Sequence, residues 1–274
     1  MKMTKGKTVL VTGSTDGVGR FVAQKLAEDG WRVLVHGRDA RRGEQVVAAI
    51  RAKRGTADFL GADLSTLAAV RGLAERVQSM TDHLELLINN AGIGSGGAAG
   101  TRQRSADGHE LRFAVNYLAG FALTRLLLPL LKKSAPARIV NVSSLGQQAI
   151  DFSDVMLTRG YTGTRAYCQS KLAQISFTFD LAHELEGSGV TANALHPATY
   201  MDTTMVRQAG VHPVSTVEQG GEAILQLAVS PALEGKSGLY FNGLREARAD
   251  AQAYDAGARQ RLKTLSLELI ATAT

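Results

Sequence analysis

Tyr167 and Lys171 stand four residues apart in the stretch AYCQSK, within a segment whose pattern predicts an amphipathic helix. Residues four apart share one face of a helix, so this phenol and this ammonium could act on the same atom. A phenol, with an ordinary pKa of about 10, is a poor base at neutral pH unless a nearby positive charge favours the phenolate. Such pairs are also common on protein surfaces, so the pair indicates proton-transfer chemistry only if other residues support it.

A second candidate site lies near the start of the chain, where VTGSTDGVGR joins a predicted strand to a predicted helix. Glycines at 13, 17 and 19 permit a tight turn, close approach of backbone N–H groups to a pyrophosphate, and close packing of the helix on the strand. Any strand-to-helix turn can use glycine. The place of this turn after the first strand nevertheless favours a dinucleotide site.

The second predicted strand ends in VLVHGRDARR, where folds specific for NAD usually present a carboxylate to the ribose 2′-hydroxyl. Here Gly37 takes that place and Arg38 follows it. A planar guanidinium can bind a 2′-phosphate in bidentate fashion, so the sequence favours NADP(H) over NAD(H), which the site could also accept. The alternative is that Arg38 is only solvated, since Asp16 and Asp39 add negative charge nearby.

Composition limits the other classes of function. The 274 residues include 31 Lys and Arg against 25 Asp and Glu, a formal net charge of +6. These basic residues are scattered, apart from a group at Arg38, Arg41 and Arg42, so no nucleic-acid partner is expected. Cys168 is the only cysteine, which excludes an internal disulfide, and no spacing of ligands suggests a metal site. We expect no signal peptide and no membrane span, and therefore a cytoplasmic protein.

The elements that must position these residues follow from a regular alternation. Short apolar runs are each followed by a longer amphipathic segment, and the runs are apolar throughout, as strands covered on both faces require. The chain is therefore predicted to be one α/β domain over residues 1–274, with a Rossmann-type, doubly wound, seven-stranded, mostly parallel sheet. The predicted strands are TVLVTG, RVLVHG, ADFLGA, LELLINNAG, ARIVNVSS, VTANALHP and SGLYFNG, and the predicted helices are 17–29, 40–53, 65–80, 107–132, 164–187 and 217–229.

Two stretches without periodicity, 145–165 and 198–216, follow the carboxyl ends of strands, where open α/β sheets bind ligands. They are candidate walls of a substrate pocket. A low-complexity piece, GSGGAAG at 94–100, is predicted to be a loop.

The motifs TGSTDGVG, NNAG, Asn116, NVSS and YCQSK occur in this order, and together they resemble the short-chain dehydrogenase/reductase family over nearly the whole chain. Within it, the stretch from AYCQSK to ALHP and the tail after GLYFNG look like the retinol-dehydrogenase-like branch. The resemblance implies catalysis by Asn116, Ser144, Tyr167 and Lys171, with Ser143 as the alternative serine. Tyr167 would be the general acid and base, Lys171 would lower its pKa and hold the ribose, Ser144 would donate to the substrate oxygen, and Asn116 would position a relay water.

The resemblance also implies a set of residues that bind the dinucleotide. They run from the glycine turn through the adenine and ribose contacts to the nicotinamide end, and comprise Gly13, Ser14, Thr15, Asp16, Gly17, Val18, Gly19, Arg38, Asp63, Leu64, Asn90, Ala91, Gly92, Tyr167, Lys171, Pro197, Thr199 and Tyr200. The sequence departs from the family where HPATYMDTTMV places Ala198 after Pro197 instead of the usual glycine. Thr203 or Thr204 could replace the family's usual threonine there.

The main hypothesis is an NADP(H)-dependent oxidoreductase that interconverts a carbonyl and an alcohol, with a small and lipophilic substrate. A non-catalytic dinucleotide sensor with the same fold is the alternative, although a sensor has no chemical need for Ser144, Tyr167 and Lys171. A sugar-nucleotide epimerase fits the glycine spacing and length less well. The family further implies a homodimer or homotetramer that pairs through 164–187 and 107–132, and the apolar content of LAQISFTFDLAHEL agrees with this, though a helix packed within its own sheet could look the same.

Overall fold

The computed structural model describes residues 6–96 and 100–272, and their strands lie in one sheet. In chain order the elements are β1 (Thr8–Val11), α1 (Gly17–Glu28), β2 (Arg32–Gly37), α2 (Ala40–Ala52), β3 (Thr56–Gly61), α3 (Leu67–Met80), β4 (Leu86–Asn89), the π-helical η2 (Phe113–Leu118), α4 (Ala119–Lys133), β5 (Ala137–Val142), α5 (Gly163–Glu184), β6 (Val190–His196), α6 (Thr204–Gln208), α7 (Val217–Val229), the short η3 (Pro231–Leu233), β7 (Tyr240–Asn242), β8 (Arg245–Ala247), the short η4 (Ala251–Tyr254) and α8 (Ala256–Thr272).

The sheet has the strand order β3-β2-β1-β4-β5-β6-β7-β8. Strands β1 to β7 are parallel, and β8 pairs antiparallel with β7. The predicted doubly wound, Rossmann-type α/β fold is therefore confirmed. The predicted count of seven strands is wrong by one, because the short strand β8 was not foreseen.

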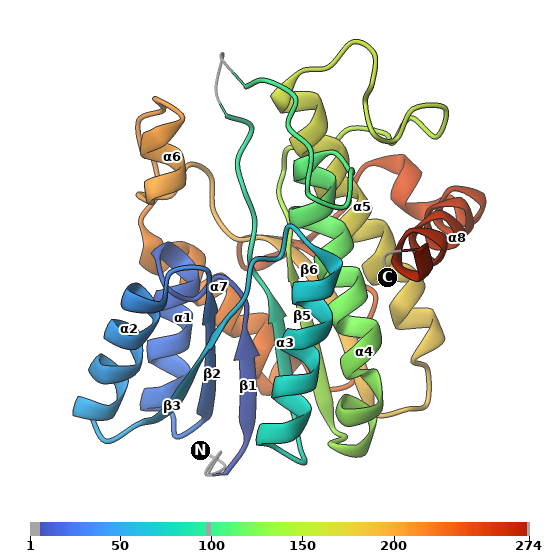
Figure 1. Ribbon diagram of the computed structural model, residues 1–274. Helices are drawn as coiled ribbons and strands as arrows, with labels where there is room; N and C mark the ends of the chain where they lie inside the picture. The colour runs from blue at the N-terminus through green and yellow to red at the C-terminus, as the bar shows by residue number, and fades with distance from the viewer. Residues whose placement is uncertain (1–5, 97–99, 273–274) are drawn as a thin grey trace.

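Helices cover both faces of the sheet, which explains why its strands are apolar throughout (Figure 1). One apolar cluster joins the sheet to α3, α4 and α5, with Phe121 and Phe177 at 1% and 3% exposure in its centre. The other joins the opposite face to α1, α2 and α7. Side-chain caps begin most of these helices: Asp16 accepts from Gly17 N at α1, and Thr162 accepts from Arg165 N at α5.

Two predicted boundaries differ from the structure for local reasons. The helix expected near 107–132 begins later, because residues 105–108 form a turn and Asp107 accepts a hydrogen bond from Leu67 N at 2.7 Å, at the start of α3. The stretch 198–216, expected to be irregular, contains α6, which Thr203 caps. Residues 97–99 of the predicted loop 94–100 lie outside the part that the structure describes.

The loops that follow the carboxyl ends of the strands gather above one edge of the sheet. Figure 1 shows α6, the segment after β4 and the stretch 145–165 together at this edge. The strand order reverses between β1 and β4, which are neighbours in the sheet, and at such a point open α/β sheets bind ligands beyond the carboxyl ends of the strands.

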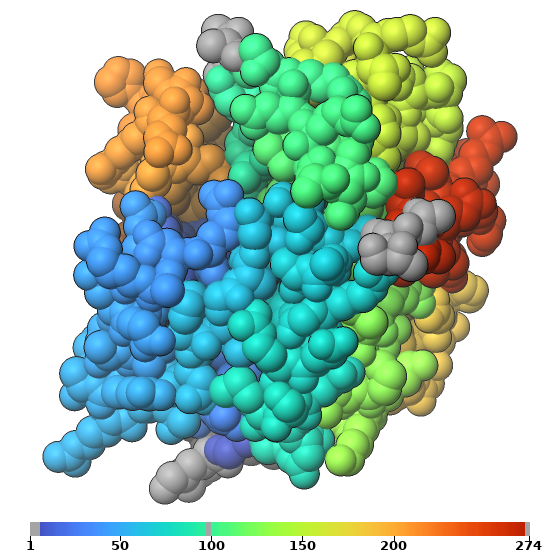
Figure 2. All heavy atoms as spheres, viewed as in Figure 1, coloured from blue at the N-terminus to red at the C-terminus, as the bar shows by residue number. Residues whose placement is uncertain are grey.

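The C-terminal helix α8 packs on α5, beside the stretch 145–165 (Figure 2). The hydroxyl of Tyr117 lies 2.7 Å from that of Ser266, and both side chains are buried. Lys263 forms ion pairs with Asp180 at 3.2 Å and Glu184 at 3.1 Å. The apolar content of α5 is thus covered within the chain, so it no longer supports the predicted homodimer or homotetramer, which stays a prediction.

One helical stretch, Phe113–Lys133, is long and apolar enough to cross a membrane. Most of it is buried inside the protein, as the core helix of a folded domain would be. The expectation of no membrane span stays a prediction.

The contact between Tyr117 and Ser266 generates a stability prediction. Ser266 Oγ donates to Leu262 O, so the Tyr117 hydroxyl is the donor to Ser266. Tyr117→Phe removes one hydrogen bond and should lower the free energy of unfolding by about 1 kcal/mol, whereas Ser266→Ala leaves a buried hydroxyl without its acceptor and should cost about 1–3 kcal/mol. Urea unfolding measures both values. Equal losses, or a larger loss for Tyr117→Phe, would contradict this assignment of the donor.

Candidate active site

The turn after β1 is shaped by glycines that no other residue could replace without displacing neighbours. Gly13 and Gly17 have φ angles of +65° and +51°, which favour glycine. A Cβ added at Gly19 would lie 2.3 Å from Gly13 O and 2.4 Å from Asn90 Nδ2. The first turn of α1 therefore packs directly on the loop, leaving a cradle of backbone that suits a pyrophosphate at the helix N-terminus.

The segment after β4 is hydrogen-bonded to this turn. Asn90 Nδ2 donates to Thr12 O at 2.9 Å and Gly13 O at 3.1 Å, while the backbone N–H groups of Asn90 and Ala91 both donate to Thr12 Oγ1. A Cβ at Gly92 would lie 3.5 Å from Lys171 Nζ. The predicted residues Asn90, Ala91 and Gly92 thus connect the glycine turn to the Tyr167 and Lys171 end of the site.

A residue that the sequence analysis missed, His36, supports the turn from β2. Its Nδ1 accepts from Gly13 N at 3.1 Å, and its backbone N–H donates to Ser14 Oγ at 2.9 Å. Burial lowers the pKa of His36 to about 4, so the ring stays neutral and keeps its acceptor nitrogen. A histidine inside the otherwise apolar run VLVHG was the available signal.

The adenosine end of the site lies beside the carboxyl ends of β2 and β3. A Cβ at Gly37 would lie 2.5 Å from Thr15 Cγ2, so a carboxylate side chain could not stand there without moving Thr15. Arg38 is exposed. Arg42 lies 3.6 Å from Asp16 and 3.8 Å from Asp39, which partly offsets the two negative charges noted in the sequence.

The two other predicted adenine contacts, Asp63 and Leu64, follow β3 at the same edge. Asp63 is exposed and accepts from Ser65 N at 3.0 Å, while Leu64 is buried. The backbone N–H of Ala62 donates to Gly37 O at 3.1 Å, which keeps this segment close to the end of β2.

Lys171 is buried below Tyr167 on α5. Its Nζ donates to Val142 O at 2.9 Å and to Gln174 Oε1 at 3.1 Å, and it lies 5.8 Å from the centre of the Tyr167 ring. Desolvation lowers the pKa of Lys171 from 10.5 to about 8. The end of β5 thus provides the carbonyl that anchors this ammonium.

The two serines of the NVSS motif have different partners. Ser143 Oγ donates to Lys171 O at 2.8 Å and is buried, so this hydroxyl holds α5 against β5. Ser144 forms the hydrogen bond to the Tyr167 side chain. Ser144 is therefore the serine that adjoins the phenol, while its predicted catalytic role, with Ser143 as the alternative, stays a prediction.

The pKa of the Tyr167 phenol is raised, because burial outweighs the opposing hydrogen bond from Ser144. The sequence analysis expected the ammonium of Lys171 to lower this pKa. Burial of the phenol has the largest effect on this pKa, and the Nζ of Lys171 is directed to Val142 O and Gln174. The lowering by Lys171 stays a prediction.

Asn116 lies in the π-helical segment η2 and links the β4 loop to α5. Its Oδ1 accepts from Ile93 N at 2.7 Å, and its Nδ2 donates to Ile93 O at 3.1 Å and Ser170 Oγ at 3.0 Å. Both polar atoms of the side chain are therefore engaged. The relay water expected at Asn116 stays a prediction.

The segment after β6 closes the nicotinamide end. His196 Nε2 lies 3.1 Å from Thr199 Oγ1, after which Tyr200 turns the chain with a φ of +44°. Of the two candidate threonines, Thr203 caps α6, and Thr204 Oγ1 donates to Asp16 Oδ2 at 2.7 Å. Both hydroxyls thus have partners within the chain, and Pro197 is buried beside them.

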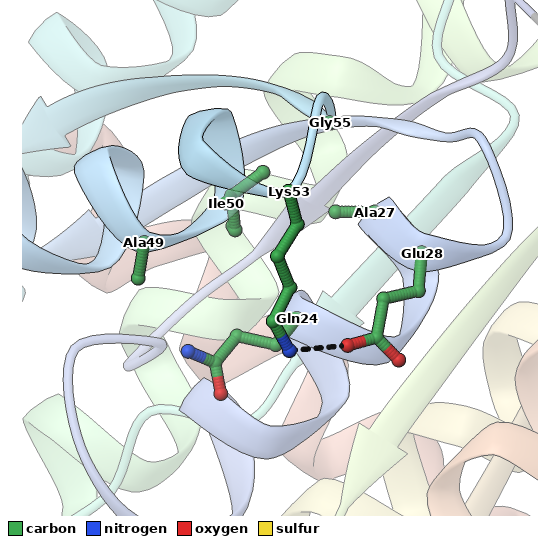
Figure 3. Close-up of a pocket in the computed structure, with 7 residues that line it drawn as sticks. All are labelled: Gln24, Ala27, Glu28, Ala49, Ile50, Lys53 and Gly55. Carbon is green, nitrogen blue, oxygen red and sulfur yellow. Dashed lines mark hydrogen bonds and ion pairs between the residues drawn. The ribbon is translucent and has the colours of Figure 1, made fainter.

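Three further features carry no role at this site. Cys168 is half-buried with a pKa raised by burial, which agrees with a packed and unreactive thiol. A hollow of 20 Å³ between α1 and α2, closed by the ion pair of Lys53 and Glu28 at 2.9 Å, has room for about one water (Figure 3). Within residues 6–96 and 100–272, no group of three His, Cys, Asp or Glu side chains is arranged to hold a metal ion.

The chain is similar to known proteins in three comparisons: with family models, with protein sequences and with solved structures. Residues 7–212 match the family described as short chain dehydrogenase. Mouse retinol dehydrogenase 13 is 38% identical over 295 residues, covering 98% of this chain and 85% of that protein. A crystal structure of a Mycobacterium paratuberculosis protein has a TM-score of 0.79 at 29% identity, covering 98% of this chain and 94% of that one. A short chain dehydrogenase from Burkholderia cenocepacia J2315 in complex with NADP has a TM-score of 0.72 at 27% identity, covering 88% and 97%.

The lowered pKa of Lys171 predicts a dependence of stability on pH. Between pH 8 and 10.5 the folded lysine has lost the proton that the unfolded chain still holds, so the free energy of unfolding rises with pH. Relative to Lys171→Met, the wild type should gain roughly 2 kcal/mol between about pH 7.5 and about pH 9.5. Urea unfolding at both pH values measures the difference. Lys132→Met, at an exposed lysine of α4, should show no such gain, and a flat or falling difference for Lys171→Met would refute the buried ammonium.

Proposed function

The chain belongs to the short-chain dehydrogenase/reductase family, in its retinol-dehydrogenase-like branch, and we propose that it uses NADP(H) to interconvert a lipophilic carbonyl compound and its alcohol. The observation that carries the proposal is the grouping of Ser144, Tyr167 and Lys171 at one end of a backbone cradle for a dinucleotide. Two adjoining hydroxyl groups, Ser144 and Tyr167, with a buried ammonium one helical turn away, suit a reaction in which charge develops on an oxygen atom.

The residues fit a nicotinamide dinucleotide. The backbone cradle of Gly13, Gly17 and Gly19 receives the pyrophosphate, and Asp63 and Leu64 lie at the adenine end. When bound, the dinucleotide supplies or accepts a hydride. The Lys171 ammonium, close to Gly92, would then donate to the ribose hydroxyls beside it.

The protein's own side chains donate and accept the proton of the reaction. In the direction of reduction, the Tyr167 hydroxyl gives its proton to the substrate oxygen, and the Ser144 hydroxyl donates a hydrogen bond to the same oxygen. The raised pKa of Tyr167 keeps the phenol protonated at neutral pH, which suits this direction. In oxidation the phenolate must form, and the charge of Lys171 favours it.

The preference for NADP(H) rests on β2. Thr15 lies so close to Gly37 that an acidic side chain is disfavoured there, and the exposed guanidinium of Arg38 follows directly. A 2′-phosphate carries negative charge that such a guanidinium can bind in bidentate fashion. The Burkholderia relative solved with NADP agrees with this preference.

A lipophilic substrate is inferred from apolar side chains at the mouth of the site. These side chains belong to the stretches 145–165 and 198–216, the candidate walls of the substrate pocket. Leu145, Tyr200 and Met205 are 48%, 53% and 41% exposed, whereas Ile150 and Leu157 are buried in the core. Exposed apolar groups beside reacting groups suit an apolar ligand. The substrate named for the mouse relative is not transferred to this chain, because a shared fold does not carry a substrate with it.

A homodimer or homotetramer and a cytoplasmic location remain part of the proposal as inferred from the sequence. The molar mass in solution, measured by light scattering at micromolar concentration, tests the assembly. The single cysteine supports a reducing compartment.

Replacement of Tyr167 with Phe is the direct test of the chemistry. It keeps the ring but removes the oxygen that transfers the proton, so kcat should fall by about 10²- to 10⁴-fold with a carbonyl substrate while the Kd for NADPH changes little. Lys171→Ala should lower kcat and also weaken NADPH binding, since the same ammonium would donate to the ribose and favour the phenolate. Steady-state rates and fluorescence titration measure the two quantities. Retention of more than about a tenth of kcat by Tyr167→Phe, with chemistry rate-limiting, would rule out the mechanism.

Arg38→Ala tests the choice of cofactor. Loss of a charged bidentate contact should cost about 1.5–3 kcal/mol, a fall in kcat/KM for NADPH of about 10- to 100-fold, while kcat/KM for NADH stays constant because NADH lacks the 2′-phosphate. Both cofactors are compared on one substrate. A wild type that prefers NADH, or equal losses with the two cofactors, would show that Arg38 does not read the 2′-phosphate.

A further inference from the structure

A buried ion pair lies outside the reacting groups, on the segment that leads into η2. Glu110 is 1% exposed and Arg112 is 6% exposed, and Arg112 Nη1 lies 3.6 Å from Glu110 Oε1. Burying two charges costs free energy that their attraction alone repays poorly, and replacing such a pair with apolar residues is often neutral. The pair is therefore expected to matter for the segments that its two side chains hold in place, more than for stability.

The pair joins three separate segments through Tyr161. Arg112 Nη1 donates to Tyr161 Oη at 2.6 Å, and this hydroxyl donates to Glu110 Oε1 at 3.1 Å. On its other side, Arg112 donates to Gly94 O at 2.9 Å and to Ser95 O at 2.7 Å. We call Glu110, Arg112 and Tyr161 the latch. The latch ties the segment after β4 to the end of the stretch 145–165.

Both segments border the reacting groups. Gly94 follows Ile93, whose backbone N–H and C=O are held by Asn116. Tyr161 stands two residues before α5, whose second turn carries Tyr167. A Cβ added at Gly163 would lie 1.9 Å from Ser95 O, so the two segments touch at this point. The latch therefore fixes the spacing between the segment after β4 and the end of the stretch 145–165.

The same wall is held at Met156 as well. Arg102 donates to Met156 O at 3.1 and 3.0 Å, and Glu110 N donates to Met156 Sδ at 3.4 Å. Residues 102–112 thus form a support for the stretch 145–165, and the latch is its buried and charged centre.

We propose that the latch is a positioning device, which sets the stretch 145–165 against the segment after β4 and so shapes the pocket for the carbonyl substrate. This rests on the proposed function. None of its three side chains is assigned a chemical role: they act by holding Gly94, Ser95 and the approach to α5. The latch should therefore affect substrate affinity more than the proton transfer or dinucleotide binding.

The test compares Tyr161→Phe and Arg112→Met with Arg71→Met, a control that removes an arginine outside the latch, which joins α3 to Ile270 O near the end of α8. Tyr161→Phe keeps the ring and loses only the hydroxyl. It should raise KM for a carbonyl substrate on the order of tenfold, as expected for a lost hydrogen bond to a charged group, with kcat and the Kd for NADPH nearly unchanged. Arg112→Met should give the same pattern more strongly, and Arg71→Met should not.

A second readout needs no turnover. Amide hydrogen exchange of the NADPH-bound protein should be faster in the latch variants over 93–96 and 145–165, and unchanged in β1 and β5. Faster exchange there together with a raised KM supports the proposal. Unchanged exchange in both stretches, or equal losses of kcat, KM and NADPH affinity, overturns it. If the wild type turns over no carbonyl substrate, the proposed function fails, while the exchange experiment still decides whether the latch orders the wall.

Discussion

The buried ammonium of Lys171 is the constraint on which the site depends. A charge removed from water needs close partners, and it finds Val142 O at the end of β5 and the side chain of Gln174 one turn further along α5. Ser143 then ties the carbonyl of Lys171 back to the same strand end. These contacts fix the position of α5 along the sheet, and with it the height of the Tyr167 phenol above the strand ends.

The second half of the site is fixed by the order of the strands. Because β4 pairs with β1, the NNAG segment runs beside the glycine turn. Four hydrogen bonds, donated by Asn90 and Ala91 and accepted by Thr12 and Gly13, join the two. Asn116 continues this connection to α5 through Ile93 and Ser170. A series of hydrogen-bonded side chains, most of them buried, thus connects the turn for the pyrophosphate to α5. A substitution at one end of such a network is expected to affect the hydrogen bonds at the other end.

The sequence was sufficient for those features that local patterns encode. Continuous apolar runs identified seven strands, and glycine spacing identified the turn after β1. It failed for short or polar elements: β8 reads REA at an edge, and α6 has five residues, too few for periodicity. Ser144 and Ser143 could be told apart only by their partners. The latch joins Arg112 to Tyr161 across 49 positions, and no spacing rule predicts such a contact.

The division between rigid and adaptable parts follows from these anchors. Tyr167 and Lys171 stand on α5, and Ser144 follows β5. The contacts of Ser143 and Lys171 hold these two elements together. Residues 145–162 form no regular helix or strand and are held at separate points: by Gln252 at Ile150, by Arg102 at Met156 and by the latch at Tyr161. Between these points the apolar side chains could vary in size without disturbing the proton donor. Under the proposed function, the spans between these anchors would set the choice of substrate, and the anchors of α5 would hold the proton donor.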